Sequence, residues 1–205
     1  MGDLIEDDPE VARIIRDEES RVENTLDLIA AENHAPRSVL EAEGSIFSLK
    51  AAEGFPGNRF HAGCRYADVL ENLAVSRAKS LFGADHANVQ PHSGVSANLA
   101  VYFSVLDVGD RILSMKLSHG GHLSHGDAAS MTSRCFDFQH YGLNLKTEQL
   151  DYDEIENLAQ RFRPRMIVAG ASSYPRLIDY GKMAAIAQAV SAVLLVDMAH
   201  IAGLV

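Results

Sequence analysis

The sequence predicts an α/β protein in which helices cover both faces of a mainly parallel β-sheet. Two short, continuous apolar runs, at 166–169 and 193–197, are typical of strands buried on both faces of such a sheet. From Asp68 onward, helical segments alternate with strands, which is the pattern of a doubly wound, three-layer α/β/α fold. The chain has 205 residues, 47% of them hydrophobic, which is enough for one good core.

The individual elements follow from local patterns. Asp8 can cap a helix and Pro9 suits its first turn, so a helical arm is expected to begin there. The Gly- and Pro-rich stretch 50–66 also holds aromatic and charged residues, which favours an ordered, functional loop over a linker. Further helices are expected at 38–47, 68–81, 94–106, 153–162 and 182–190, and strands at 87–90, 111–115, 166–169 and 193–197. The predicted parts are an arm with the loop, 1–67, and an α/β domain, 68–205.

Composition and charge narrow the possible partners. The net charge of -10 repels phosphate backbones, so we expect no nucleic-acid partner. No apolar run reaches the roughly 20 residues that span a bilayer, and the acidic N-terminus is unlike a secretory signal. We therefore expect a cytoplasmic protein without membrane contact, with Cys64 and Cys135 as free thiols. The apolar end at Leu204-Val205 suggests a domain that is incomplete at its C-terminus.

Polar residues follow the predicted strands, where α/β sheets bind their ligands. After the strand ending at Gln90, Ser93 can cap a helix and Gly94 lets a ligand approach the free N–H groups, a combination suited to phosphate. A plain helix cap without ligand is the alternative.

Asp197 ends a very apolar strand, with His200 three residues later. A poorly solvated carboxylate needs a cationic partner, such as a protonated pyridine nitrogen. The alternative is a carboxylate that caps a neighbouring loop. After another strand end, Ser172 can donate to a phenolate oxygen or lie in an ordinary loop.

Three histidines, His119, His122 and His125, lie within seven residues of a glycine-rich stretch. Metal sites usually add Cys or carboxylate ligands at set spacing, and only Asp127 is close by, so we expect no metal. The glycines favour close approach to a flat ligand on which one imidazole stacks. The four segments together suggest a site for pyridoxal 5'-phosphate (PLP).

These motifs resemble the serine hydroxymethyltransferase (glycine hydroxymethyltransferase) family of fold-type I PLP enzymes. The resemblance covers essentially the whole chain and rests on Leu28–Asn33, Ala52–Arg59, Asn88–Gly94, His119–Leu123 with His125-Gly126, and Val196–Val205. It implies the large domain of that fold behind an N-terminal helical arm, and a homodimer or dimer of dimers. It also implies transfer of the serine hydroxymethyl carbon to tetrahydrofolate in one-carbon metabolism, which yields glycine and 5,10-methylene-tetrahydrofolate.

The resemblance also implies a role for individual residues. Ser93 and Gly94 would hold the PLP phosphate, and Asp197 would pair with the pyridine nitrogen. His122 would stack on the ring, and Ser172 and His200 would lie at the phenolic oxygen. His122 and His200 count as catalytic together with the family's acid/base glutamate, Glu53, which would reach in from the neighbouring subunit. The folate pteridine would contact Leu117, Gly121 and Leu123.

Departures from the family pattern fall near the substrate. Ala51 replaces a tyrosine, Phe60 and His61 replace two more, and Ala31 replaces a serine that contacts the substrate carboxylate. We infer a wider, less hydroxylated pocket and hypothesise an α-substituted substrate such as α-methylserine. The alternative is a degenerate paralogue with weak ordinary activity.

The family's Schiff-base lysine lies beyond Val205, and no lysine of this sequence substitutes for it. The 205-residue chain alone is therefore expected to be inactive. Two other functions remain open: a non-catalytic PLP-fold binding module, and another fold-type I enzyme such as a threonine aldolase or transaldolase. The Glu53 loop and the Gly121–Leu123 stretch favour the folate-linked enzyme over that aldolase.

Overall fold

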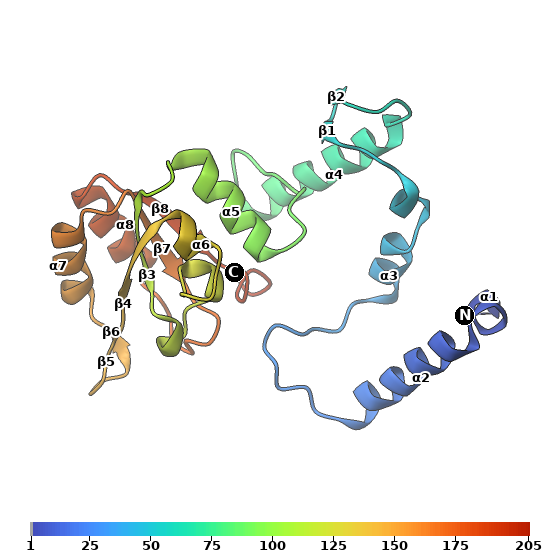
Figure 1. The fold of residues 1–205 in the computed structure, drawn as a ribbon, viewed down its shortest axis with the longest axis horizontal. Coiled ribbons are helices and arrows are strands. Elements are labelled where there is room, and N and C mark those ends of the chain that lie inside the picture. Colours follow the sequence, from blue (N-terminus) through green and yellow to red (C-terminus); the bar gives the residue numbers. More distant parts are fainter. Residues whose placement is uncertain (1) are drawn as a thin grey trace. The chain divides into compact units, whose positions relative to one another are not determined.

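A computed structural model of the chain describes residues 2–205, which form two compact units (Figure 1). The first unit ends at His34 and the second spans Ala35–Val205. The predicted division after residue 67 stays a prediction. None of the helices within residues 2–205 is long and apolar enough to cross a bilayer.

The first unit consists of two helices, α1 (Gly2–Asp7) and α2 (Pro9–Asn24), followed by irregular chain. Asp8 caps α2 as predicted, because its carboxylate accepts a hydrogen bond from the N–H of Val11 at 3.0 Å. The apolar residues of the predicted stripe are largely exposed within this unit: Val11, Ile14, Ile15 and Val22.

The second unit opens with α3 (Arg37–Glu43), a 3₁₀ turn (Ile46–Leu49) and a small hairpin. A helix is present within the predicted segment 38–47, but its predicted end is wrong, because α3 ends at Glu43 and Ser45 caps the separate turn. The hairpin pairs β1 (Gly54–Phe55) with β2 (Asn58–Arg59), so the predicted ordered loop contains a tight turn. The next helix, α4 (Arg65–Phe82), begins one turn earlier than expected.

The main sheet has four parallel strands in the order β4-β3-β7-β8. Their bounds are β3 (Arg111–Met115), β4 (Asp137–Tyr141), β7 (Met166–Gly170) and β8 (Val193–Asp197). Three of them were predicted. The edge strand β4 was not, because only Tyr141 of its five residues is buried and its sequence lacks an apolar run.

Helices cover both faces of this sheet, which confirms the predicted three layers (Figure 1). On one face, α7 (Tyr152–Phe162) and α8 (Tyr180–Ala189) pack against Leu113 and Ile167. On the other, α5 (Gly94–Val105) places Tyr102 against Ile112 and Val168. Neighbouring residues along β3 and β7 thus face opposite layers, as strand geometry requires.

The strand predicted at 87–90 is wrong, because this segment pairs with no strand within residues 2–205. The backbone N–H of Gln90 is instead satisfied locally, by the side-chain oxygen of Asn88 at 2.9 Å. Minor elements complete the unit: α6 (Thr132–Cys135), a hairpin of β5 (Leu143–Asn144) and β6 (Gln149–Leu150), and 3₁₀ turns at Leu117–His119 and Leu123–His125.

Candidate functional site

The predicted ligand-binding segments meet at one edge of the main sheet. The strands β3, β7 and β8 are parallel, so the loops after Met115, Gly170 and Asp197 leave from the same side. Gly170 lies in register with Asp197 on the neighbouring strand. We call this region the carboxyl edge.

Asp197 is the centre of the carboxyl edge. Its Oδ2 accepts hydrogen bonds from Nδ2 of Asn98 and Nε2 of His125, both at 2.9 Å. Its Oδ1 accepts the backbone N–H of Ala199 at 3.1 Å. A carboxylate has about four acceptor positions, so one remains free on Oδ1. The side chain is 15% exposed, which leaves room for one more donor.

These donors fix the charge of Asp197. The hydrogen bond from His125, assisted by those from Asn98 and Ala199, holds the pKa of the Asp197 carboxyl far below its ordinary value. Burial acts in the opposite direction but is outweighed. Asp197 is therefore a fixed negative charge at neutral pH.

A chain of hydrogen bonds joins Asp197 to His122. Nδ2 of Asn98 donates to Oγ of Ser124 at 2.9 Å as well as to Asp197. Oγ of Ser124 lies 2.8 Å from Nδ1 of His122, and the Ser124 N–H donates to the same nitrogen at 3.1 Å. Since His122 Nδ1 accepts these bonds, its ring proton belongs on Nε2. The carboxylate and the imidazole are thus oriented by one buried network.

His122 is held as a neutral ring. Burial lowers the pKa of His122, and the nearby His125 and His200 lower it further, while Asp197 opposes them. The rings of His122 and His125 meet edge to face, with centroids 5.7 Å apart. His200 is half-buried in the turn after Asp197, where it is close enough to affect His122.

Helix α5 begins at the same edge, since Asn98 on its second turn reaches Asp197. Ser93 caps the helix, with its Oγ accepting the Ser96 N–H at 3.1 Å. A Cβ added to Gly94 would meet no atom within 4 Å, so the space beside this residue is open. The helix therefore presents N–H groups and its positive dipole end to a free volume, as an anion site requires.

The loop after β3 approaches the other loops through glycines. The N–H of Ser172 donates to the carbonyl of Gly120 at 2.7 Å, which ties the β7 loop to this segment. A Cβ on Gly121 would lie 2.3 Å from the carbonyl oxygen of Met115, so only glycine fits there. The Ser172 hydroxyl makes no hydrogen bond to the described part of the chain. Leu117 and Leu123 leave much of their side chains exposed.

The three histidines of this loop have different surroundings. His119 is a structural residue, because its Nδ1 accepts the N–H of Leu143 at 2.8 Å. His122 and His125 line a cavity of about 330 Å³ with Lys116 and His140. Nδ1 of His125 is buried in the described structure without a hydrogen-bond partner. No group of His, Cys, Asp or Glu within residues 2–205 is arranged to hold a metal ion.

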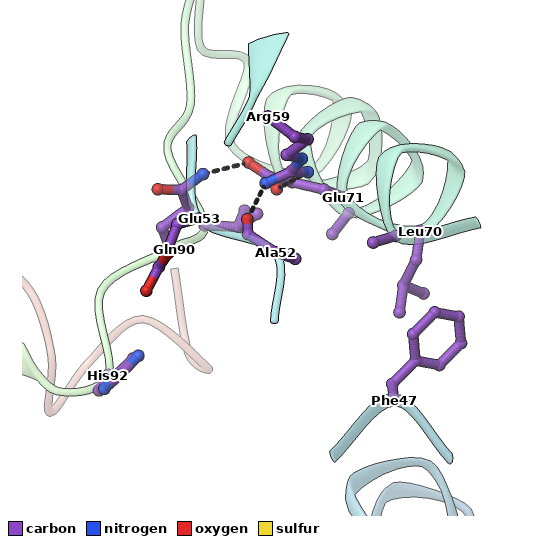
Figure 2. A pocket seen from close by; sticks show the side chains of 11 residues that line it. Phe47, Ala52, Glu53, Arg59, Leu70, Glu71, Gln90 and His92 are labelled. Atoms are coloured by element: carbon purple, nitrogen blue, oxygen red, sulfur yellow. Dashed lines mark hydrogen bonds and ion pairs between the residues drawn. The ribbon is translucent and has the colours of Figure 1, made fainter. Parts of the chain in front are cut away.

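Glu53 lies on the loop before β1 rather than at the carboxyl edge. Its carboxylate is 73% exposed and lies 2.5 Å from Nε2 of His61. Figure 2 shows Glu53 beside Gln90, at a cavity of about 530 Å³ that is also lined by Phe47 and Leu70. Within residues 2–205, no hydrogen bond or ion pair joins Glu53 to Asp197. The nearby Ala51 is exposed, while Ala31 belongs to the first unit.

Sequence reasoning missed three residues of the carboxyl edge: Asn98, Ser124 and His125. Asn98 and Ser124 are buried polar residues, and their signal was weak, because a polar residue on a helix or in a turn is usually solvated. His125 belonged to the histidine-rich stretch but had no assigned role. Its side chain, 1% exposed, turns out to contact Asp197 directly.

A parallel α/β sheet with a carboxylate, an imidazole and a helix N-terminus at its carboxyl edge defines a ligand-binding α/β protein. Comparison with known proteins identifies the family. Residues 4–205 match the family model described as serine hydroxymethyltransferase. The chain is 54% identical over all 205 residues to curated serine hydroxymethyltransferases from three strains of Dehalococcoides mccartyi.

The chain therefore belongs to the serine hydroxymethyltransferase family, and the predicted fold-type I class is confirmed. It aligns with 49% of the length of these relatives, so it spans about half of them.

Proposed function

We propose that the full-length protein containing this chain transfers the hydroxymethyl group of serine to tetrahydrofolate, with PLP as cofactor. The observation that carries the proposal is Asp197, which stands at a strand end as a fixed negative charge with one free acceptor position. A protonated pyridine nitrogen is the cation that such a position suits. The names of the relatives support the hydroxymethyl transfer.

The residues at the carboxyl edge fit PLP. The open space at Gly94 and the start of α5 suit its phosphate, with Ser93 alongside. The neutral ring of His122 suits stacking on a flat heterocycle. The Ser172 hydroxyl and His200 are the available donors for the phenolic oxygen. When bound, PLP supplies an electron sink for negative charge on the substrate carbon.

Asp197 keeps a proton on the pyridine nitrogen by its charge. The hydrogen bonds from Asn98 and His125 stabilise the ionised carboxylate, so the proton stays on the nitrogen rather than moving to Asp197. His122 and His200 are proposed to orient the reacting groups.

Glu53 is proposed as the residue that moves a proton to and from the substrate hydroxyl. The exposure of its carboxylate supports action in a homodimer, in which Glu53 of one subunit serves the other subunit's site. Leu117, Gly121 and Leu123 are proposed to contact the folate, since two exposed leucines offer apolar surface for a flat ring. We propose a cytoplasmic location for this enzyme.

Substitutions in and near the loop that carries Glu53 favour a second substrate, an α-substituted serine. Ala51, Phe60 and His61 stand where the family has tyrosines, and Ala31 stands where it has serine. An α-substituted serine such as α-methylserine would fit the added space beside Ala51.

The test is a transfer assay on the full-length protein with tetrahydrofolate, PLP and either L-serine or α-methylserine. Formation of methylene-tetrahydrofolate from either amino acid supports hydroxymethyl transfer, and the ratio of kcat/KM values identifies the substrate. Cleavage of threonine without any folate-dependent reaction would instead indicate an aldolase. PLP binding without turnover would indicate a binding module.

A further inference from the structure

The guanidinium of Arg59 binds carbonyl groups on both sides of Glu53, and Figure 2 shows its contact with Ala52. Its Nη1 donates to the carbonyl oxygen of Ala52 at 2.7 Å and to that of Gly54 at 2.8 Å. The Arg59 side chain is only 6% exposed, so these bonds are shielded from water. A single side chain therefore holds the peptide group before Glu53 and the carbonyl group of Gly54, the residue after it.

Two carboxylates of α4 fix the guanidinium in turn. Nε of Arg59 donates to Asp68 at 2.8 Å, and Nη2 donates to Glu71 at 2.6 Å. Hydrogen bonding to Arg59 lowers the pKa of Asp68, and hydrogen bonds to Asp68 and Glu71 raise the pKa of Arg59, so Arg59 and Asp68 stay charged. The planar guanidinium serves four acceptors at once, which a lysine ammonium with three donors cannot reproduce.

Gln90 extends this arrangement toward the start of α5. Its side-chain amide donates to Oε1 of Glu71 at 2.7 Å and to the carbonyl of Gly54 at 2.9 Å. Gln90 lies three residues before Ser93, the proposed phosphate residue. A continuous set of contacts therefore runs from the Glu53 backbone through Glu71 and Gln90 to the segment that leads into the phosphate site.

We propose that Arg59, with Glu71 and Gln90, is a positioning unit that holds Glu53 for proton transfer. This inference rests on the proposed role of Glu53. The Glu53 side chain is exposed, and in the described part of the chain its carboxylate is hydrogen-bonded only to His61, so the position of the carboxylate depends on its backbone. A shift of about 1 Å at a reacting group is enough to cost roughly 100-fold in rate.

The experiment is a double-mutant cycle on the PLP-loaded full-length protein, with Arg59→Lys and Glu53→Gln made singly and together. We expect Arg59→Lys to lower kcat roughly 10- to 100-fold, while KM for serine and PLP occupancy change less than about 3-fold. In the Glu53→Gln background, Arg59→Lys should lower kcat less than about 2-fold, because the carboxylate that Arg59 positions is already lost. Arg37→Lys, at an exposed ion pair with Glu41, is the matched control and should leave kcat unchanged.

An equal decrease in kcat from Arg59→Lys in the wild-type and Glu53→Gln backgrounds would overturn the inference. A decrease in kcat that is explained by lower PLP occupancy or a lower melting temperature would overturn it as well. If Arg59→Lys does not fold, Gln90→Ala takes its place in the cycle with the same criteria, because Gln90 is exposed. The activity of the wild-type protein tests the proposed function independently of the double-mutant cycle. An active wild type with an additive cycle refutes only the positioning unit, whereas an inactive wild type refutes both proposals.

Discussion

Nε2 of His125 lies 2.9 Å from Oδ2 of Asp197, although 72 positions separate the two residues in the sequence. His125 is buried in the loop after β3, and Asp197 ends β8, so the contact spans the width of two strands. The bond fixes both the direction and the charge of the carboxylate.

The charge of Asp197 predicts how stability depends on pH. Its pKa in the folded protein is lowered, whereas in the unfolded chain it titrates near 4. Below about pH 5 the unfolded chain therefore binds the extra proton, and the stability that Asp197 contributes at neutral pH is lost on acidification. Urea unfolding from pH 6 to pH 3 should show a steeper decline for wild type than for Asp197→Asn. Parallel curves would contradict the assigned charge.

Asn98 is predicted to be the most sensitive amide of the chain. Asn98→Ala removes the donor to both Asp197 and Ser124 and leaves each of these poorly solvated acceptors one hydrogen bond short, which costs about 1–3 kcal/mol in the free energy of unfolding. Asn24→Ala, at the exposed end of α2, is the control and should cost less than about 0.5 kcal/mol. Urea titration measures both, and similar losses would argue against a buried network.

Substitution by alanine should affect different properties at two glycines of the carboxyl edge: stability at Gly121 and PLP affinity at Gly94. Gly121→Ala places a Cβ 2.3 Å from the Met115 carbonyl and should destabilise the fold by about 1–3 kcal/mol. Gly94→Ala adds a methyl group to open space, so the melting temperature should stay within a few degrees while PLP affinity falls. Thermal unfolding without PLP and a PLP titration separate the two effects. Loss of stability in Gly94→Ala would contradict the open phosphate site.

The substrate hypothesis predicts the effect of restoring a tyrosine. Ala51→Tyr in the full-length protein should lower the kcat/KM ratio of α-methylserine to L-serine by about 10-fold or more, because the ring fills the added space. Ala62→Tyr, at an exposed position of the same loop, serves as the control. An unchanged ratio in Ala51→Tyr would show that this position does not select the substrate.

The strands and the main helices were predictable because their apolar runs, periodicity and caps are local signals. Asp8, Ser93 and the run 193–197 each carried such a signal. The expected burial of 193–197 on both faces was wrong, because β8 lies at the edge of the described sheet and none of its five residues is buried. The strand β4 escaped prediction because its sequence, Asp137–Tyr141, has no apolar run and only Tyr141 is buried. The segment 87–90 was misassigned because strand formation needs a pairing partner, which a sequence window does not contain.

The residues of the candidate site also fall into those that local sequence signals could predict and those that they could not. The positions of Asp197 and Ser172 at or after strand ends could be predicted from the sequence alone, and their roles stay proposals. Asn98, Ser124 and Arg59 were not, because their importance comes from contacts across distant parts of the chain. Only the folded structure brings Asn98 to Asp197 and Arg59 to the carbonyls beside Glu53.

The most direct test of the account is PLP affinity of the full-length protein, measured by equilibrium dialysis for wild type, Asp197→Asn and Arg37→Lys. The proposed pairing of Asp197 with the pyridine nitrogen contributes a charged hydrogen bond of about 1.5–3 kcal/mol. This pairing therefore predicts roughly 10- to 100-fold weaker binding for Asp197→Asn and unchanged binding for Arg37→Lys. Equal affinity of Asp197→Asn and wild type would contradict the placement of PLP at the carboxyl edge.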